Sequence, residues 1–144
     1  MNGYQDALKK NGKKPDDILI IYFNEDEVKN KKNIQKLLKE KNKPDGIFAS
    51  VEKLAIYAYE ICAELKLNIP KDIKIISFSN LQTAALLNPS LTTIAQPAYE
   101  IGREAASILF KLIEKRGFNF LPERTVIKSK LIKRKSTKGE RAGK

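Results

Sequence analysis

The sequence predicts an α/β fold in which a parallel β-sheet carries helices on both faces. Short apolar runs of strand length alternate with longer stretches in which apolar residues recur at helical spacing. The short runs are apolar at consecutive positions, which is typical of strands buried on both faces of a sheet. Strands of this kind, alternating with helices, build right-handed βαβ units and a parallel sheet.

Four apolar runs are expected to form strands. They are residues 18–23, 46–49, 73–78 and 124–132. The first three are short and almost free of charge, as buried strands are. The last contains lysines, which are typical of a strand at the edge of a sheet.

Four stretches are expected to form helices. They are residues 4–10, the stretch from the sequence NEDE to Pro44, residues 51–66 and residues 97–117. The NEDE sequence provides a cap and favourable negative charge at the amino end of its helix. Proline is favoured in the first turn of a helix and glycine just after the last, which sets the limits Pro97 and Gly117.

The composition excludes several classes of function. The 144 residues include one cysteine, Cys62, and no histidine, so the chain cannot form an internal disulfide, a zinc cluster or a Cys/His nucleophile. No glycine-rich phosphate loop follows a predicted strand. We therefore expect no catalytic residue, no metal and no cofactor, and we expect that the protein is not an enzyme.

The sequence also carries no sign of a membrane protein. No apolar stretch approaches the ~20 residues of a membrane span, and the start MNGYQDALKK lacks the apolar run of a secretory signal. A single cysteine fits a reducing compartment. We expect a cytoplasmic protein with no membrane partner.

The formal net charge of +11 raises the question of nucleic-acid binding. Much of the charge lies in residues 29–43 and 133–144. In the first segment lysines alternate with apolar residues at helical spacing, which indicates the solvated face of an amphipathic helix. We expect residues 135–144 to form a disordered basic tail. Direct contact with nucleic acid is the alternative interpretation of both segments.

Polar residues follow three of the predicted strands at the point where each leaves the sheet. They are Asn24 and Glu25, Ser50 and Glu52, and Ser79 and Asn80. Because the carboxyl ends of parallel strands share one edge, these residues are expected to form the rim of a ligand cleft. The alternative is that Asn24, Ser79 and Asn80 only cap helices or turns.

The helix expected at residues 51–66 is apolar nearly all round. Beside its core stripe, Ile56, Tyr59 and Ala63 form a second apolar stripe at helical spacing. Such a stripe needs a cover, which is either another chain or a further layer of the same fold.

The motifs PDGIFASVEKLA, LNIPKDIKIISFS and PSLTTIAQP follow one another along the chain. They are similar to the patterns P-x-A-I-F-A-x-N-D-x-x-A, L-x-x-P-x-D-x-x-V-x-G-F-D and P-x-L-T-T-[IV]-x-Q-P of the LacI/GalR family of bacterial transcription regulators. The sequence NGYQDAL also resembles the G-[YF]-x-x-A-L helix of that family. The resemblance runs from residue 3 to about residue 134 and concerns the ligand-sensing domain.

The resemblance implies a periplasmic-binding-protein-like fold of two α/β lobes, with the effector between the lobes and an amino-terminal helix-turn-helix domain on operator DNA. Residues 1–134 are then a partial effector-binding and dimerisation domain, the C-terminal lobe, with residues 91–120 on the crossover and first-lobe side. We expect operator contact only through a helix-turn-helix domain absent from this chain. The alternative is a solute-binding protein of a sugar transport system, which shares the fold.

Carried over by position, the effector-contacting Asn of the family falls on Val51, its strand-end Asp on Ser79 and its crossover Gln on Gln96. A valine side chain makes no hydrogen bond, and a neutral serine in place of a carboxylate reduces the repulsion of a negative ligand group. The effector implied by the family is a sugar or sugar derivative. The predicted ligand-binding residues are Asn24, Glu25, Val51, Ser79, Asn80 and Gln96.

The resemblance also implies a homodimer. In the family, the helix that corresponds to residues 51–66 and the segment that corresponds to residues 84–87 form part of the dimer contact. The predicted interface residues are Ile56, Tyr59, Ala63, Leu86 and Leu87.

Overall fold

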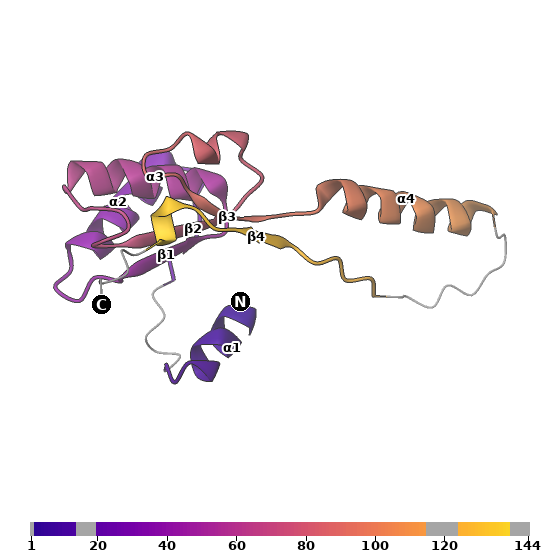
Figure 1. Ribbon diagram of the computed structural model, residues 1–144, viewed down its shortest axis with the longest axis horizontal. Coiled ribbons are helices and arrows are strands. Elements are labelled where there is room, and N and C mark those ends of the chain that lie inside the picture. The colour runs from indigo at the N-terminus through magenta and orange to yellow at the C-terminus, as the bar shows by residue number, and fades with distance from the viewer. Residues whose placement is uncertain (1, 14–19, 115–123, 139–144) are drawn as a thin grey trace.

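A computed structural model describes residues 2–13, 20–114 and 124–138 of the chain (Figure 1). Its centre is a four-stranded sheet in the order β1-β2-β3-β4. The strands are Gly46–Ala49, Lys74–Phe78, Thr92–Ala95 and Lys130–Ile132. β1, β2 and β3 are parallel, and β4 pairs antiparallel with β3 at the edge of the sheet. The structure confirms the predicted α/β class and the edge position of the last strand.

Two helices cover one face of this sheet. α3 (Glu52–Glu64) packs against β1 and β2, and α2 (Glu27–Lys39) packs against α3. α2 begins where it does because the Asp26 side chain accepts hydrogen bonds from the amides of Val28, at 2.8 Å, and Lys29, at 3.2 Å. The acidic sequence therefore caps α2 as the pattern predicts.

The hydrophobic core lies between α3 and the sheet. Ile73, Ile75 and Leu91 are fully buried, and α3 contributes Ala58 and Ile61. Complete burial of one such large aliphatic side chain contributes about 1.5–3 kcal/mol to folding. The strands, α2 and α3 together are called the packed lobe below.

The run at residues 18–23 does not form the predicted strand. Residues 18 and 19 lie outside the described residues, and Ile20–Phe23 has no strand structure. The physical reason is a competing partner on α2. The buried Asn30 side chain accepts a hydrogen bond from the Asn24 amide at 2.9 Å and donates one to the Asn24 carbonyl at 2.6 Å. These bonds hold the segment to α2 instead of the edge of the sheet.

Three other expectations are changed by the structure. Thr92–Ala95 forms β3, which was not among the predicted strands because its two threonines and short length give no apolar run. Of residues 124–132, only Lys130–Ile132 pairs as a strand.

α1 (Asn2–Lys10) does not pack against the strands, so among the described residues the second helical layer is not found. Its few apolar side chains offer little area to bury, and Tyr4 stays 44% exposed.

The disordered tail expected from residue 135 is not what the structure has at its first residues. Lys135–Thr137 form a 3-10 helix, and Ser136 is fully buried. The Ser136 hydroxyl donates to the Ile75 carbonyl at 2.6 Å and accepts from the Thr92 amide at 2.8 Å. It thus bridges β2 and β3 where their pairing begins. Residues 139–144 of the expected tail lie outside the described residues.

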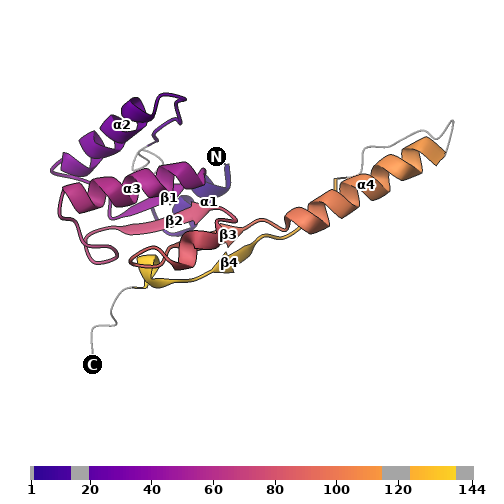
Figure 2. The same ribbon diagram turned by 90° about the horizontal axis from the view of Figure 1, so that it is seen from above.

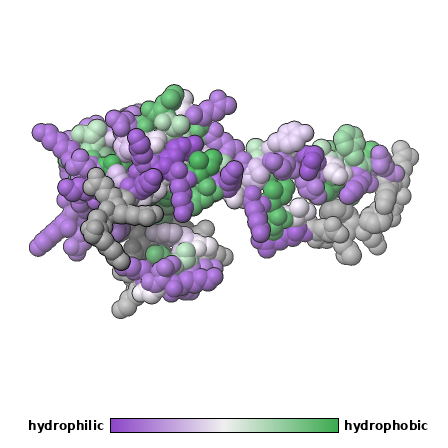
Figure 3. Space-filling model, in the orientation of Figure 1, coloured by the Kyte–Doolittle hydropathy of each residue, from purple (hydrophilic) through white to green (hydrophobic). Residues whose placement is uncertain are grey.

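α4 (Ala98–Glu114) extends away from the packed lobe as an arm (Figures 1 and 2). β3 leads out to it, and β4 leads back into the sheet (Figure 1). None of its residues is buried, although Leu109, Phe110 and Ile113 are apolar. Apolar surface is accordingly visible along the arm in Figure 3. The predicted helix is confirmed up to Glu114, and residues 115–117 lie outside the described residues.

Candidate functional site

The carboxyl ends of β1, β2 and β3 meet at one edge of the sheet, because the three strands are parallel. The structure joins the residues that follow them into two hydrogen-bonded pairs, Ser79 with Glu52 and Asn80 with Gln96. We call these four residues the carboxyl edge. Ligands of open α/β sheets bind at this place, so the edge is the candidate functional site.

Ser79 ends β2 with its hydroxyl already engaged. Its side chain donates to a Glu52 carboxylate oxygen at 2.6 Å and accepts from the Leu81 amide at 2.8 Å. The residue is 4% exposed. The hydroxyl therefore both caps the following turn and binds a carboxylate at the edge.

Asn80 binds the backbone beyond the end of β3. Its side-chain nitrogen donates to the Gln96 carbonyl at 3.0 Å, and its side-chain oxygen accepts from the Gln96 amide at 2.7 Å. Asn80 and Gln96 are both exposed. The crossover glutamine of the family pattern is thus held at the edge by Asn80.

The three remaining predicted ligand residues are not part of these two pairs. The Asn24 side-chain oxygen accepts from the Asp26 amide at 2.9 Å, which makes a turn before α2. Glu25 is exposed. Val51 is the N-cap residue of α3, makes no side-chain cap bond and is 37% exposed. The structure therefore joins only Ser79, Asn80 and Gln96 of the predicted set to the hydrogen-bonded edge.

The charge expected at the edge needs a correction. The absence of a carboxylate at position 79 predicted less repulsion of a negative ligand group. Glu52 instead supplies a carboxylate 2.6 Å from the Ser79 hydroxyl. A negative charge is thus present at the edge, carried by α3 in place of the end of β2. The sequence signal was the position of Glu52 three residues after the end of β1, but its partner lies 27 residues further along the chain.

An ionic network beside the edge joins α2 to α3. Lys31 lies 2.9 Å from a Glu27 oxygen and 2.7 Å from a Glu60 oxygen, and the Tyr57 hydroxyl donates to Glu27 at 2.8 Å. Hydrogen bonds to Glu60 and Glu27 raise the pKa of Lys31 above its usual range. The hydrogen bonds from Lys31 and Tyr57 lower the pKa of the Glu27 carboxyl. The sequence pattern placed Lys31 on a solvated helix face, with nucleic-acid contact as the alternative, and did not indicate its partners Glu27 and Glu60.

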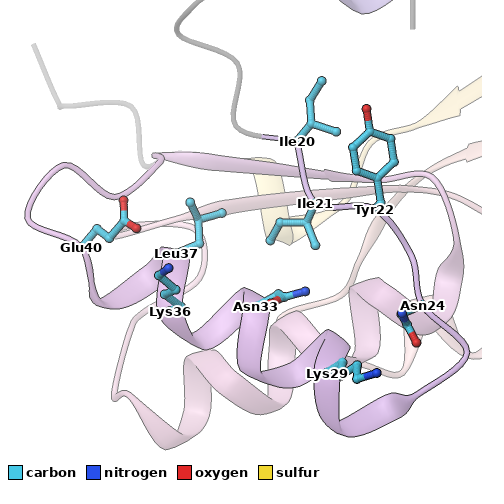
Figure 4. Close-up of a pocket in the computed structure, with 9 residues that line it drawn as sticks. All are labelled: Ile20, Ile21, Tyr22, Asn24, Lys29, Asn33, Lys36, Leu37 and Glu40. Carbon is cyan, nitrogen blue, oxygen red and sulfur yellow. The ribbon is translucent and has the colours of Figure 1, made fainter.

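A surface hollow lies over α2 and not at the carboxyl edge (Figure 4). It measures about 560 Å³ and is open to solvent. Ile20, Ile21 and Tyr22 approach it from the irregular segment, and Leu37 approaches it from α2. Of the predicted ligand residues it includes only Asn24. It exists because the segment before α2 crosses over that helix without entering the sheet.

The predicted dimer residues divide into two groups. Tyr59 and Leu87 pack against the chain's own core, and the Tyr59 hydroxyl donates to the Pro89 carbonyl at 2.7 Å. Burial raises the pKa of Tyr59 to about 12. Ala63 is exposed, Leu86 is 80% exposed and Ile56 is half-buried. Part of the predicted dimer surface therefore packs against the core, and part remains exposed.

The groups relevant to metal and thiol chemistry in this chain are its acidic side chains and Cys62. No cluster of three or more His, Cys, Asp or Glu side chains that could hold a metal occurs among residues 2–13, 20–114 and 124–138. Cys62 is buried, and desolvation raises the pKa of its thiol to about 11. A thiol with this pKa is a poor nucleophile near neutral pH. Within the same ranges, no helix has the length and apolar character needed to span a bilayer.

Comparison with known proteins gives a consistent result. Residues 1–137 match the model of the periplasmic binding protein-like domain. The chain is 31% identical to the HTH-type transcriptional regulator MalR of Clostridium butyricum over 136 residues, which are 94% of this chain and 40% of MalR. The chain therefore spans about two fifths of that relative.

Two solved structures have the same fold. A putative LacI-family regulator from Sanguibacter keddieii has a TM-score of 0.82 and 27% identity, with 95% of this chain and 51% of that chain covered. A LacI-family regulator from Enterococcus faecium with bound ribose has a TM-score of 0.77 and 27% identity, with 94% and 49% covered. These relatives are described as transcriptional regulators and not as enzymes.

Proposed function

Because the chain belongs to the periplasmic-binding-protein-like domain family in its LacI/GalR type, we propose that it is the small-molecule-sensing lobe of a DNA-binding transcription regulator. Effector binding would change the angle between this lobe and a second lobe, and with it the fit of a dimer to two operator half-sites. The observation that carries the proposal is the carboxyl edge. It brings Glu52, Ser79, Asn80 and Gln96 together at the place where such sheets bind ligands.

The proposed effector is a sugar or a sugar derivative. The ribose bound to the Enterococcus faecium relative supports this class. A sugar hydroxyl donates as well as accepts, so it suits the Glu52 carboxylate and the exposed Gln96 amide. Val51 stands where the family has an asparagine, so that contact would be apolar. We therefore expect this protein to recognise a hydroxyl-bearing ligand by a different set of contacts from its relatives.

The edge can be tested by NMR titration of the chain with ribose, lactose and cellobiose. Amide shifts at Glu52, Ser79 and Gln96 are the expected result, with weak affinity because one lobe covers only one side of a ligand. The variant Glu52→Gln should weaken binding of the responding sugar by about tenfold, since a hydrogen bond to a charged group is lost. Glu64→Gln, at the other end of α3, is the matched control. Shifts confined to other surfaces, or equal effects of both variants, would contradict the proposed site.

A genomic observation separates a regulator from the alternative solute-binding protein. A helix-turn-helix segment encoded upstream in the same reading frame would support the regulator, and a secretory signal peptide would support the transport protein. The chain alone should bind DNA only through its lysines. That binding should weaken steeply with salt and show no sequence preference.

We also propose that the chain forms a homodimer through the exposed residues of the predicted interface. Leu86, 80% exposed and adjacent to the core residue Leu87, supports this surface. Light scattering should give a mass above that of a monomer, and Leu86→Glu should reduce it. Leu109→Glu on α4 is the control, because it places the same charge on a different exposed apolar surface. A monomeric wild-type chain at micromolar concentration would refute the dimer, and an effect of Leu109→Glu alone would move the contact to the arm.

A further inference from the structure

The pairing of β2 with β3 continues beyond its last backbone hydrogen bond through one side chain. The last backbone bond runs from the Ser79 amide to the Ile94 carbonyl, at 3.1 Å. Two residues beyond Ile94, just after the end of β3, the Asn80 side-chain amide donates to Gln96 and accepts from it, at 3.0 and 2.7 Å. A side-chain amide carries the same donor and acceptor as a peptide group, so Asn80 takes the place of one more residue of β2.

Gln96 is the position at which the arm leaves the sheet. On its other side, the pairing of β3 with β4 ends at Ala95 and Lys130. The Gln96 carbonyl also accepts from the Ala98 amide at 2.9 Å, in the first turn of α4. Among the described residues, the hydrogen bonds that Gln96 makes to the packed lobe come from Asn80.

We propose that Asn80 is a positioning residue that fixes the direction of α4 relative to the packed lobe by holding the backbone of Gln96. The two hydrogen bonds from Asn80 restrict rotation about the Gln96 backbone. Without them, Gln96 and Pro97 would be free to rotate. Asn80 directly follows Ser79, whose hydroxyl is bound to Glu52 at the candidate site. A ligand at the carboxyl edge that hydrogen-bonds to the Asn80 side chain would therefore compete with the clamp, the pair of hydrogen bonds between Asn80 and Gln96.

This consequence for signalling rests on the proposed function, but the clamp itself does not. Its test uses the chain without ligand or DNA, so its failure and the failure of the proposed function are distinguishable. Nitroxide labels are attached to Glu64→Cys on α3 and Lys111→Cys on α4, both exposed positions, in a Cys62→Ala background. Pulsed electron paramagnetic resonance then measures the distribution of distances between lobe and arm.

Asn80→Ala should broaden this distribution, and it should speed hydrogen exchange at the Gln96 amide by about tenfold. Ser79→Ala is the matched control. It removes hydrogen bonds of the neighbouring residue to Leu81 and Glu52 but leaves Gln96 bound, so its distribution should keep the wild-type width. A wild-type width for Asn80→Ala, or equal broadening by both variants, would overturn the proposal.

Asn80→Asp gives a pH-dependent signature that a general loss of stability would not produce. At neutral pH its carboxylate oxygen faces the Gln96 carbonyl, and the distance distribution should broaden. Near pH 4, where an ordinary Asp protonates, the neutral carboxyl can again donate to Gln96, and the distribution should narrow. This variant keeps the size of the side chain and also serves if Asn80→Ala fails to fold. A width that does not change with pH would contradict the clamp.

Discussion

α3 and α4 are both helices with a large apolar content, yet α3 is packed against the rest of the chain and α4 is not. α3 buries Ala55, Ala58 and Ile61 against the sheet and α2. α4 has no buried residue, and Leu109 and Phe110 on it are 56% and 61% exposed. Apolar periodicity therefore predicts that a segment is helical, but it does not identify the surface that will cover it.

The difference has an energetic consequence. Helices in proteins are stabilised mainly by packing of their apolar face, and an isolated helix of this length is marginal in water. The packed lobe should therefore unfold as one cooperative unit, while α4 should contribute little to that transition. Leu109, Phe110 and Ile113 of α4 are among the large apolar side chains that remain exposed, as is Leu86.

The largest expected effect comes from removing equivalent aliphatic volume in the two regions. Ile75→Ala should lower the free energy of unfolding by about 2–5 kcal/mol, because a fully buried side chain leaves a cavity. Leu109→Ala should change it by less than about 0.5 kcal/mol, because the side chain is exposed. Urea unfolding followed by tyrosine fluorescence measures both, since most tyrosines lie outside α4. A cost at Leu109 similar to that at Ile75 would show that α4 is packed in solution.

A second prediction concerns the carboxyl-terminal segment that holds the start of β3. Ser136→Ala should lower the free energy of unfolding by about 1–3 kcal/mol, because the Thr92 amide and Ile75 carbonyl lose their buried partner. Lys135→Ala, at an exposed neighbouring position, is the control and should have little effect. Equal stability of Ser136→Ala and the wild type in urea would mean that the Ser136 hydroxyl does not stabilise the lobe.

Much of this fold could be predicted because the relevant signals are local. β1 and α3 were predicted closely, since a short apolar run ends at Ser50 and a helical period follows it. Ile20–Phe23 has the same apolar signal and forms no strand, because Asn30 on α2 binds the adjacent backbone of Asn24. Only the tertiary structure reveals such a competing partner.

The candidate site was predictable as a place but not as a set of contacts. Parallel strands put Ser79 and Asn80 at one edge, which the strand pattern alone indicated. The partners of these residues, Glu52 and Gln96, lie 27 and 16 residues away in sequence. Both interpretations offered for Ser79 and Asn80 are compatible with the geometry, since each side chain binds backbone and also lies at the edge.

The smallest expected effect lies in the ionic network that joins α2 to α3 inside the packed lobe, a contact that α4 lacks. The Glu27 carboxyl has a lowered pKa, so its stabilising contribution is present above its unfolded value of about 4.3 and is lost as the pH falls through the folded value. Lys31 has a raised pKa, so its contribution is present below about 10.4 and is lost as the pH rises. Lys31→Met should therefore lower the urea midpoint by a small amount that is greatest between about pH 5 and pH 10 and shrinks towards both extremes.

Lys32→Met is the matched control, because Lys32 makes no ion pair within the described part of α2. The alkaline losses that burial of Tyr59 and Cys62 produces occur in the wild type and the variant alike and cancel in the difference. A difference in midpoint that stays constant from pH 3 to pH 11 would show that Lys31 acts through packing on the Tyr57 ring, 5.0 Å away, and not through its charge pairs.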